Sequence, residues 1–306
     1  MKNKLKKKKY KKAIIIEHFP KAFSSLRLLD ELTDKEISES FDPVLNKESL
    51  KSIKESDGKS GSFFFTTYDK KFIVKTISET EVKKLTSPEF LRSFTTFLKL
   101  NGENSLINRI YGVYTILLSS NSSISIILMP NLVFIPHRLI YRIFDLKGSR
   151  IDRITPDINK SSKNKLKALK DLDYLWINDT VGIADFSGDS IEHILTTLED
   201  DLSFLREQRL MDYSLLVIIA EFPKKNDELY DEVISLFGNP KFYKKIFKSR
   251  TSKYIYCLGL IDYLQEFNLT KFLENKYKKL LYWSEVKYIS AVDPMNYAQR
   301  MKDFLK

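Results

Sequence analysis

The sequence predicts an α+β fold in which antiparallel sheets pack with helices. Two short apolar runs, residues 215–220 and 254–261, have the length and the branched side chains of buried strands. They are separated by residues 222–253, a charged and irregular stretch that has the character of an insertion between two strands. Residues 63–75 have the pattern of two further strands around a tight turn, and an apolar stripe predicts a helix over residues 189–205. Paired strands together with a long amphipathic helix indicate an α+β protein.

Two aspartates flank the predicted strand pair. Asp212 precedes the first strand and Asp262 directly follows the second. If the strands pair antiparallel, both carboxylates project from the same end of the sheet. Two acids held in this way suit a divalent cation or a proton transfer. The ordinary alternative is that each aspartate ends a strand or caps a turn.

A loop of small residues precedes the strand pair at residues 63–75. Such residues let backbone N–H groups approach an anion closely, and here they are Gly58, Ser60, Gly61 and Ser62. Lys75 ends the second strand and is placed to reach the same anion, while Glu81 lies in a segment of helical pattern and is placed to pair with Lys75. A solvated strand lysine and an exposed helix carboxylate are the plain alternatives.

The middle of the chain contains a predicted bend and a cationic turn. The bend follows a strand-like run and includes Met129, Asn131 and Leu132. The turn is rich in glycine and serine and carries Lys147, Arg150 and Arg153, with Asp145 placed to orient these cations. Cations that converge beside a glycine suit phosphate recognition, and a solvated basic loop is the alternative.

The composition favours an anionic partner. The 306-residue chain has a formal charge of +11 and a pI of about 9.3, which suits nucleic acid, an anionic membrane or a phosphorylated substrate. A single cysteine excludes an intramolecular disulfide framework and a cysteine-rich zinc site, and it fits a reducing cytoplasm. No apolar run approaches the length of a membrane-spanning helix.

The order of these features is that of a phosphotransferase of the protein-kinase type, although the His-Arg-Asp and Asp-Phe-Gly motifs of ordinary protein kinases are missing. From about Gly58 to Phe304 the chain instead closely resembles the phosphatidylinositol phosphate kinases. The resemblance rests on seven motifs in order: Gly58-Lys-Ser-Gly-Ser62, Phe72-Ile-Val-Lys-Thr76, Phe144-Asp-Leu-Lys-Gly-Ser149, Leu169-Lys-Asp-Leu-Asp173, Met211-Asp-Tyr-Ser-Leu-Leu216, Gly259-Leu-Ile-Asp262 and Ile289-Ser-Ala-Val-Asp-Pro294.

The resemblance implies a two-lobed, protein-kinase-like fold that binds ATP and Mg²⁺ between its lobes, with the hinge near residues 129–132. The loop at residues 58–62 matches the stretch that covers the ATP phosphates. Lys75 matches the lysine that contacts these phosphates, and Glu81 matches its acidic partner. Asp262 matches the metal-binding aspartate. Asp212 matches the catalytic-loop aspartate, which orients or deprotonates the substrate hydroxyl or shares the metal.

The resemblance also implies how the lipid headgroup is held. Lys147 and Arg153 match the basic residues that face the inositol phosphate, and Lys271 and Glu274 lie in the segment associated with substrate choice. Glu274 resembles the acid of enzymes that phosphorylate the 5-hydroxyl. Phe272 departs from the family, because it replaces the second lysine of a pair and leaves the preferred lipid isomer open.

The resemblance implies a lipid kinase that makes phosphatidylinositol 4,5-bisphosphate from the 4-phosphate and ATP. The alternatives are 5-kinase action on the 3-phosphate, 4-kinase action on the 5-phosphate, and a catalytically silent membrane scaffold. We expect a basic tail over residues 1–23, one lobe over 24–130 and a second over 131–306, forming one kinase domain over 24–306. We also expect a cytoplasmic protein at the cytosolic face of membranes, the plasma membrane above all, with no nucleic-acid partner; a homodimer is left open.

Overall fold

The computed structural model describes residues 5–10, 13–51, 54–55, 62–119, 122–151, 153–155, 165–177, 188–238, 245–267 and 293–305. The chain forms two compact units. The first comprises Met1–Glu103, Asn108–Phe134 and Pro240–Phe242, and the second comprises Asn104–Ile107, Ile135–Asn239 and Tyr243–Lys306. Helices and antiparallel sheets occur in both, so the prediction of an α+β protein is confirmed.

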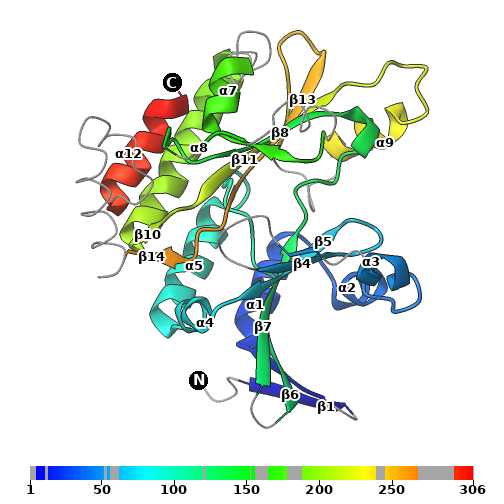
Figure 1. The fold of residues 1–306 in the computed structure, drawn as a ribbon, viewed down its shortest axis with the longest axis vertical. Coiled ribbons are helices and arrows are strands. Elements are labelled where there is room, and N and C mark those ends of the chain that lie inside the picture. Colours follow the sequence, from blue (N-terminus) through cyan, green and yellow to red (C-terminus); the bar gives the residue numbers. More distant parts are fainter. Residues whose placement is uncertain are drawn as a thin grey trace. The chain divides into compact units, whose positions relative to one another are not determined.

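The first unit is built on a seven-stranded sheet in the order β1-β2-β6-β7-β5-β4-β3, with every neighbouring pair antiparallel. Its strands are β1 (Leu5–Tyr10), β2 (Ala13–His18), β3 (Lys54–Glu55), β4 (Phe63–Thr66), β5 (Phe72–Ile77), β6 (Gly112–Ser119) and β7 (Ser122–Pro130). Its helices are α1 (Pro20–Leu29), α2 (Asp34–Ser40), α3 (Lys47–Lys51), α4 (Glu79–Leu85) and α5 (Pro88–Asn101). Figure 1 shows them in blue to green.

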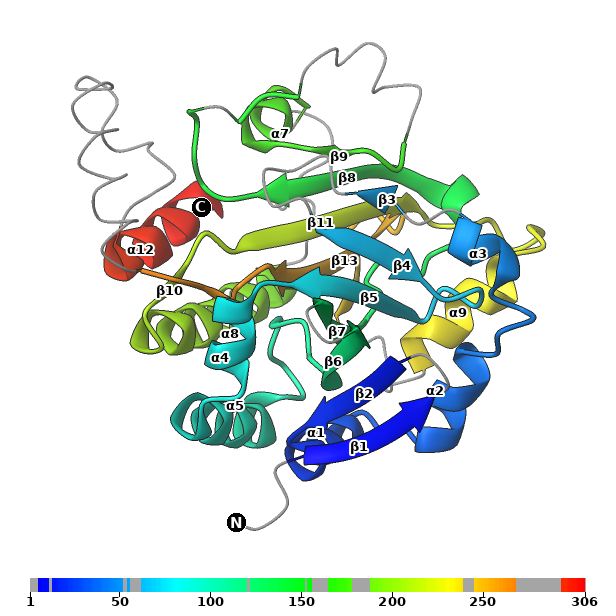
Figure 2. The ribbon, with the colours of Figure 1, turned by 60° about the horizontal axis from the view of Figure 1, so that its bottom comes forward.

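The start of the chain differs from the expected basic tail. Residues 1–23 contain β1, β2 and the beginning of α1. The apolar residues 14–16 of β2 pair with β6, about a hundred positions further along the chain. Because the lysine-rich β1 pairs with β2, it forms the edge strand of the sheet (Figure 2).

The predicted turn between β4 and β5 is confirmed, and Asp69 organises it. Its carboxylate accepts hydrogen bonds from Thr67 Oγ1 at 2.7 Å, from Ser40 Oγ at 2.6 Å and from the backbone N–H of Lys71 at 3.2 Å. These bonds hold the pKa of Asp69 below its ordinary value, although burial alone would raise it. The turn therefore sets the register of β5 against β4.

The second unit is built on a five-stranded sheet in the order β12-β13-β11-β8-β9, with a separate two-stranded ladder β10-β14. Its strands are β8 (Ile140–Leu146), β9 (Ala168–Leu169), β10 (Leu210–Met211), β11 (Ser214–Glu221), β12 (Ile246–Lys248), β13 (Tyr254–Ile261) and β14 (Gln265–Glu266). Its helices are the short 3₁₀ helix η1 (His137–Leu139), α7 (Asp171–Ile177), α8 (Gly188–Glu207), α9 (Tyr230–Gly238) and α12 (Pro294–Leu305). Among the strands that the structure describes, β9 is the one that pairs parallel to its neighbour strand.

The core of the second unit lies between the central strands and two helices. Every described side chain of β13 except that of Ile261 is buried, which explains the continuous apolar run in the sequence. The apolar stripe predicted for residues 189–205 belongs to α8, and its residues Ile194, Leu198 and Leu202 are buried. Helix α12 packs alongside α8 (Figure 1). Within the described part of the chain, no helix combines the length and the apolar character needed to span a bilayer.

Candidate active site

The two predicted strands that flank the aspartates pair as expected. Strands β11 and β13 are antiparallel, and Ser214 at the start of β11 lies opposite Ile261 at the end of β13. Asp212 comes two residues before this pair and Asp262 comes directly after it. The pairing therefore brings both aspartates to the same end of the sheet.

Both aspartates occupy an interruption between two ladders. Asp212 lies in the connection from β10 to β11, and Asp262 lies in the connection from β13 to β14. Because β10 pairs with β14, the two chain segments run together again beyond the interruption. Asp212 and Asp262 both have left-handed backbones, with φ of 61° and 58°. This conformation is uncommon outside glycine and is best tolerated by Asn and Asp, and such strain concentrates at functional sites.

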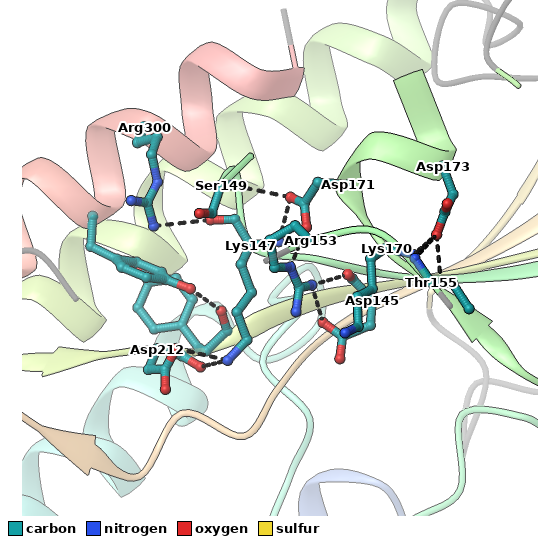
Figure 3. Close-up of polar contacts among 12 residues, drawn as sticks. Asp145, Lys147, Ser149, Arg153, Thr155, Lys170, Asp171, Asp173, Asp212 and Arg300 are labelled. Atoms are coloured by element: carbon teal, nitrogen blue, oxygen red, sulfur yellow. Dashed lines mark hydrogen bonds and ion pairs between the residues drawn. The ribbon is translucent and has the colours of Figure 1, made fainter. Parts of the chain in front are cut away.

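Lys147 holds Asp212 through two contacts. Its Nζ donates to Asp212 Oδ1 at 2.7 Å and to the backbone carbonyl of Asp212 at 2.8 Å. Lys147 follows the end of β8, the neighbour of β11 in the sheet, so the two residues come from adjacent segments. The bond to the carbonyl fixes the strained backbone and the bond to Oδ1 orients the carboxylate (Figure 3).

Asp145, the last-but-one residue of β8, forms a second ion pair. Arg153 Nη2 lies 2.9 Å from Asp145 Oδ1, and it also donates to the backbone carbonyl of Asp145. Burial alone would raise the pKa of the Asp145 carboxyl, but Arg153, the hydroxyl of Ser214 and Lys147 together hold that pKa below its ordinary value. The carboxylate is therefore kept ionised beside the Lys147–Asp212 pair.

Asp171, at the start of α7, fixes the cationic turn from behind. Its side chain is fully buried. Oδ1 accepts the backbone N–H groups of Lys147 at 2.9 Å and Ser149 at 3.2 Å, and Oδ2 accepts Arg153 Nε at 2.5 Å. One carboxylate thus determines the backbone of the turn and the position of its arginine (Figure 3).

Asp173 acts in the same way on the next residues of the chain. Its Oδ2 accepts the hydroxyl of Thr155 at 2.5 Å and the backbone N–H groups of Thr155 at 3.0 Å and Lys170 at 2.9 Å. Asp171 and Asp173 belong to one of the seven sequence motifs, but that motif predicted no role for either residue. The signal available was a pair of acids, two residues apart, in the first turn of an otherwise apolar helix.

Helix α12 braces the other side of the turn. Gly148 has φ of +66°, and a Cβ built on it would lie 3.1 Å from the carbonyl oxygen of Arg300. Arg300 Nη2 in turn donates to the carbonyl of Lys147 at 3.2 Å. The hydroxyl of Tyr297 donates to the carbonyl of Tyr213, the residue after Asp212, at 2.5 Å. Neither Tyr297 nor Arg300 was expected at the site from the sequence.

Arg153 is less accessible than a side chain that binds a phosphate from solvent. Its side chain is only 11% exposed, and its guanidinium contacts the carboxylates of Asp145 and Asp171. Both carboxylates raise the pKa of Arg153 against the effect of burial, so the charge is retained. The geometry suits a residue that positions Asp145 and the turn.

Lys75 and Glu81 belong to the first unit. Lys75 is 8% exposed, pairs with Phe64 in the β4–β5 register, and its Nζ lies 5.7 Å from the centre of the Phe64 ring. The carboxylate of Glu81 accepts the backbone N–H of Ser78 at 2.7 Å and the hydroxyl of Ser78 at 2.8 Å, which makes it the acid of a capping box on α4. The ion pair between Lys75 and Glu81 stays a prediction.

The predicted bend at residues 129–132 is described by the structure, whereas most of the loop before β4 is not. Met129 lies in β7 opposite Ile73, and Leu132 is buried. Asn131 is also buried, and its side chain donates to the carbonyls of Lys70 at 2.8 Å and Val133 at 3.1 Å, so it organises the bend. Ser62 is half-exposed. The remaining predicted site residues lie outside the described residues: Gly58, Ser60, Gly61, Lys271 and Glu274.

The donor set of Asp212 and Asp262 suits a magnesium ion that also binds a phosphate. Within the described residues, no group of three or more Asp, Glu, His or Cys side chains could hold a metal. Mg²⁺ characteristically takes one or two carboxylates, and it completes its coordination with water and substrate phosphates. The two aspartates therefore fit a metal that arrives with a phosphorylated ligand, and do not form a closed metal cage.

The geometry combines paired aspartates with a fixed cationic turn, an arrangement whose charges suit phosphate groups. A family model described as phosphatidylinositol-4-phosphate 5-kinase matches residues 44–235 and 237–306. The chain therefore belongs to the phosphatidylinositol-4-phosphate 5-kinase family. The matched range includes both aspartates and the turn.

Individual relatives agree with the family model. Phosphatidylinositol 4-phosphate 5-kinase 4 of Arabidopsis thaliana is 29% identical over 94% of this chain and 41% of its own length. The phosphatidylinositol 4-phosphate 5-kinase of Plasmodium falciparum is 29% identical over 96% of this chain and 18% of its own. The kinase its3 of Schizosaccharomyces pombe is 27% identical over 82% and 41%. The chain thus spans less than half the length of these curated relatives.

Proposed function

We propose that this chain is a lipid kinase that transfers the γ-phosphate of ATP to the 5-hydroxyl of phosphatidylinositol 4-phosphate. The observation that carries the proposal is the Lys147–Asp212 ion pair at the interrupted ladder, on the same sheet end as Asp262. The names of the relatives supply the reaction and the substrate. The proposed product is phosphatidylinositol 4,5-bisphosphate.

The proposed arrangement is a two-lobed, protein-kinase-like fold that binds ATP between the lobes. The backbone N–H groups of residues 58–62 and the ammonium group of Lys75 hold the ATP phosphates, with Glu81 as the acidic partner of the lysine. The bend at residues 129–132 lies beside the nucleotide, with the half-buried side chain of Met129 offering apolar surface and the buried Leu132 contributing its main chain. Because Asn131 uses its side chain on backbone carbonyls, it shapes this bend and contacts the nucleotide only through its main chain.

Asp212 and Lys147 act on the reacting hydroxyl. Asp262 and Asp212 are the residues that would hold a magnesium ion, whose positive charge would offset the negative charge of the transferring phosphoryl group. A carboxylate oxygen of Asp212 accepts the proton of the 5-hydroxyl as that oxygen bonds to the γ-phosphorus of ATP. The bond from the γ-phosphorus to the bridging oxygen of the β-phosphate breaks and ADP leaves, and the proton later passes from Asp212 to water. Lys147 orients this carboxylate and places a positive charge beside the incoming phosphate.

The inositol phosphate is received by the cationic turn. Lys147 is its main cation. Arg153 and Asp145 hold the turn in shape, because the arginine is engaged with two carboxylates. Lys271 and Glu274 select the position of the hydroxyl. A peripheral association with the anionic cytosolic face of a membrane, the plasma membrane above all, brings the substrate within reach, and the net charge of +11 supports this association.

The identity of the product tests the proposal. The protein is incubated with ATP, Mg²⁺ and vesicles that carry the 3-, 4- or 5-monophosphate, and the product isomer is determined by chromatography. We expect phosphatidylinositol 4,5-bisphosphate, formed fastest from the 4-phosphate. A faster reaction with the 5-phosphate would overturn the assignment of the hydroxyl, and the absence of product from all three lipids would favour a silent scaffold.

A further inference from the structure

Helix α7 has an outer face that is apolar although it is exposed. Trp176 is 64% exposed, Leu175 is 37% exposed and the neighbouring Ile154 is 43% exposed. Leu172 completes the set; it lies one helical turn before Trp176 and its backbone N–H donates to the carbonyl of Arg153, beside Ile154. We call these four residues the α7 face. An exposed tryptophan among exposed aliphatic residues is typical of a surface that binds a protein, a ligand or a membrane.

The inner face of α7 is already used. Tyr174 is buried against the rings of Phe144 and Phe304, at 5.2 and 5.9 Å between centroids. Asp171 and Asp173 are fully buried and accept hydrogen bonds from the cationic turn and the residues that follow it. The α7 face is therefore not the core-facing side of this helix.

The exposed charges of the described segment 165–177 have one sign. In the described segment 165–177 the two carboxylates are fully buried, whereas the lysines are exposed or half-exposed. These lysines are Lys165, Lys167 and Lys170. An exposed tryptophan and leucine beside exposed ammonium groups suit the interface of an anionic bilayer, where indole rings reside at headgroup level and lysines meet lipid phosphates.

We propose that the α7 face is a membrane-docking surface that inserts Trp176 and Leu175 into the interface of an anionic lipid bilayer. The proposal rests on the proposed function for its purpose. Through Asp171 and Asp173, helix α7 is hydrogen-bonded to residues 147–155. Docking of α7 therefore places the cationic turn at the depth of the lipid headgroups, and the same two aspartates that shape the turn connect it to the membrane anchor.

Vesicle binding by the full chain provides the first test. Trp176→Ala should bind vesicles of phosphatidylcholine and phosphatidylserine about tenfold more weakly than the wild type, because the indole no longer enters the interface. Trp176→Phe should retain most of the affinity. Leu100→Ala is the matched control, since Leu100 is a 79% exposed apolar residue of α5. Equal affinities for wild type and Trp176→Ala would overturn the proposal.

A spectroscopic test observes the indole directly. The chain has two tryptophans, so Trp283→Phe leaves Trp176 as the only one. Its fluorescence should shift to the blue on addition of the anionic vesicles, and lipids brominated on their acyl chains should quench it. A spectrum that responds neither to the vesicles nor to brominated lipids would overturn the insertion of Trp176.

Turnover separates this proposal from the proposed function. The factor by which Trp176→Ala lowers activity should be about tenfold smaller with a short-chain, water-soluble phosphatidylinositol 4-phosphate than with vesicles. An equal loss on both substrates would overturn the docking role. If the wild type binds vesicles through Trp176 but turns over neither substrate, the docking surface stands and the kinase assignment fails. A change of Trp176→Ala from dimer to monomer with unchanged vesicle binding would instead show a contact between copies and overturn the proposal.

Discussion

The substitution Asp171→Asn examines how the cationic turn is held. Asp171 is fully buried and receives two backbone N–H groups and Arg153 Nε. The amide has nearly the same shape but loses the negative charge, and it turns an N–H toward at least one of these donors. Removing one partner of a buried ion pair costs about 3 kcal/mol, and we expect that decrease in the free energy of unfolding.

The same substitution should lower catalysis through the position of Lys147. If the turn relaxes, Lys147 Nζ moves away from Asp212, and a displacement of about 1 Å in a catalytic arrangement costs about a hundredfold in rate. We expect kcat/KM on phosphatidylinositol 4-phosphate vesicles to fall by about this factor, mostly in kcat. Urea unfolding and initial-rate kinetics measure the two effects.

Asp173→Asn is the matched control for this experiment. Asp173 is equally buried, but its carboxylate accepts hydrogen bonds from neutral groups of Thr155 and Lys170. We expect a smaller loss of stability, about 1–2 kcal/mol, and a loss of activity below about tenfold. Full activity of Asp171→Asn, or equal losses in the two variants, would refute the role of Asp171 in positioning Lys147.

Three further predictions concern other parts of the chain. Gly148→Ala should lower stability by about 2 kcal/mol in urea unfolding, because it forces a Cβ into a left-handed backbone 3.1 Å from the carbonyl oxygen of Arg300. Lys75→Met should abolish turnover in a phosphate-transfer assay while vesicle sedimentation stays close to wild type, since Lys75 is proposed to contact ATP and not lipid. Burial raises the pKa of Asp201 to about 7, so stability is greatest below the unfolded value near 4 and falls as the pH rises through 7. Asp201→Asn removes the ionisable group and one acceptor for the hydroxyl of Ser105 or the backbone N–H of Leu106. It should therefore flatten the fall of the urea midpoint between about pH 4 and 7, and an unchanged pH dependence would contradict the assignment.

Local patterns predicted the frame of the site correctly. The apolar runs of β11 and β13 are short and continuous, so both strands could be predicted from the residues. The expectation that Asp212 and Asp262 lie at one end of the sheet depended on antiparallel pairing, which the structure confirms. The turn at Asp69 was equally readable, because its residues act on one another over a few positions. The capping box of Ser78 and Glu81 was also visible in the sequence but was interpreted only as a charge for Lys75.

Local sequence patterns could not predict contacts between segments that are distant in the chain. Asp171 and Asp173 act on backbone N–H groups and on an arginine eighteen residues away, and nothing in their own neighbourhood shows which groups they meet. Arg153 has the sequence setting of a phosphate ligand, but Asp145 and Asp171 surround its guanidinium. Strand β2 needed β6 as a partner from a remote part of the chain, which is why its segment was interpreted as part of a tail.

We propose that the paired aspartates carry out phosphoryl transfer to a lipid. The most direct measurement is the transfer of labelled γ-phosphate from ATP to phosphatidylinositol 4-phosphate vesicles as Mg²⁺ is varied, with the wild type, Asp212→Asn and Asp262→Asn compared after circular dichroism has confirmed their folding. We predict Mg²⁺-dependent formation of the bisphosphate by the wild type and at least a hundredfold less by each variant, as expected when transition-state stabilisation is removed. Wild-type rates in Asp262→Asn, with an unchanged dependence on Mg²⁺, would contradict the claim.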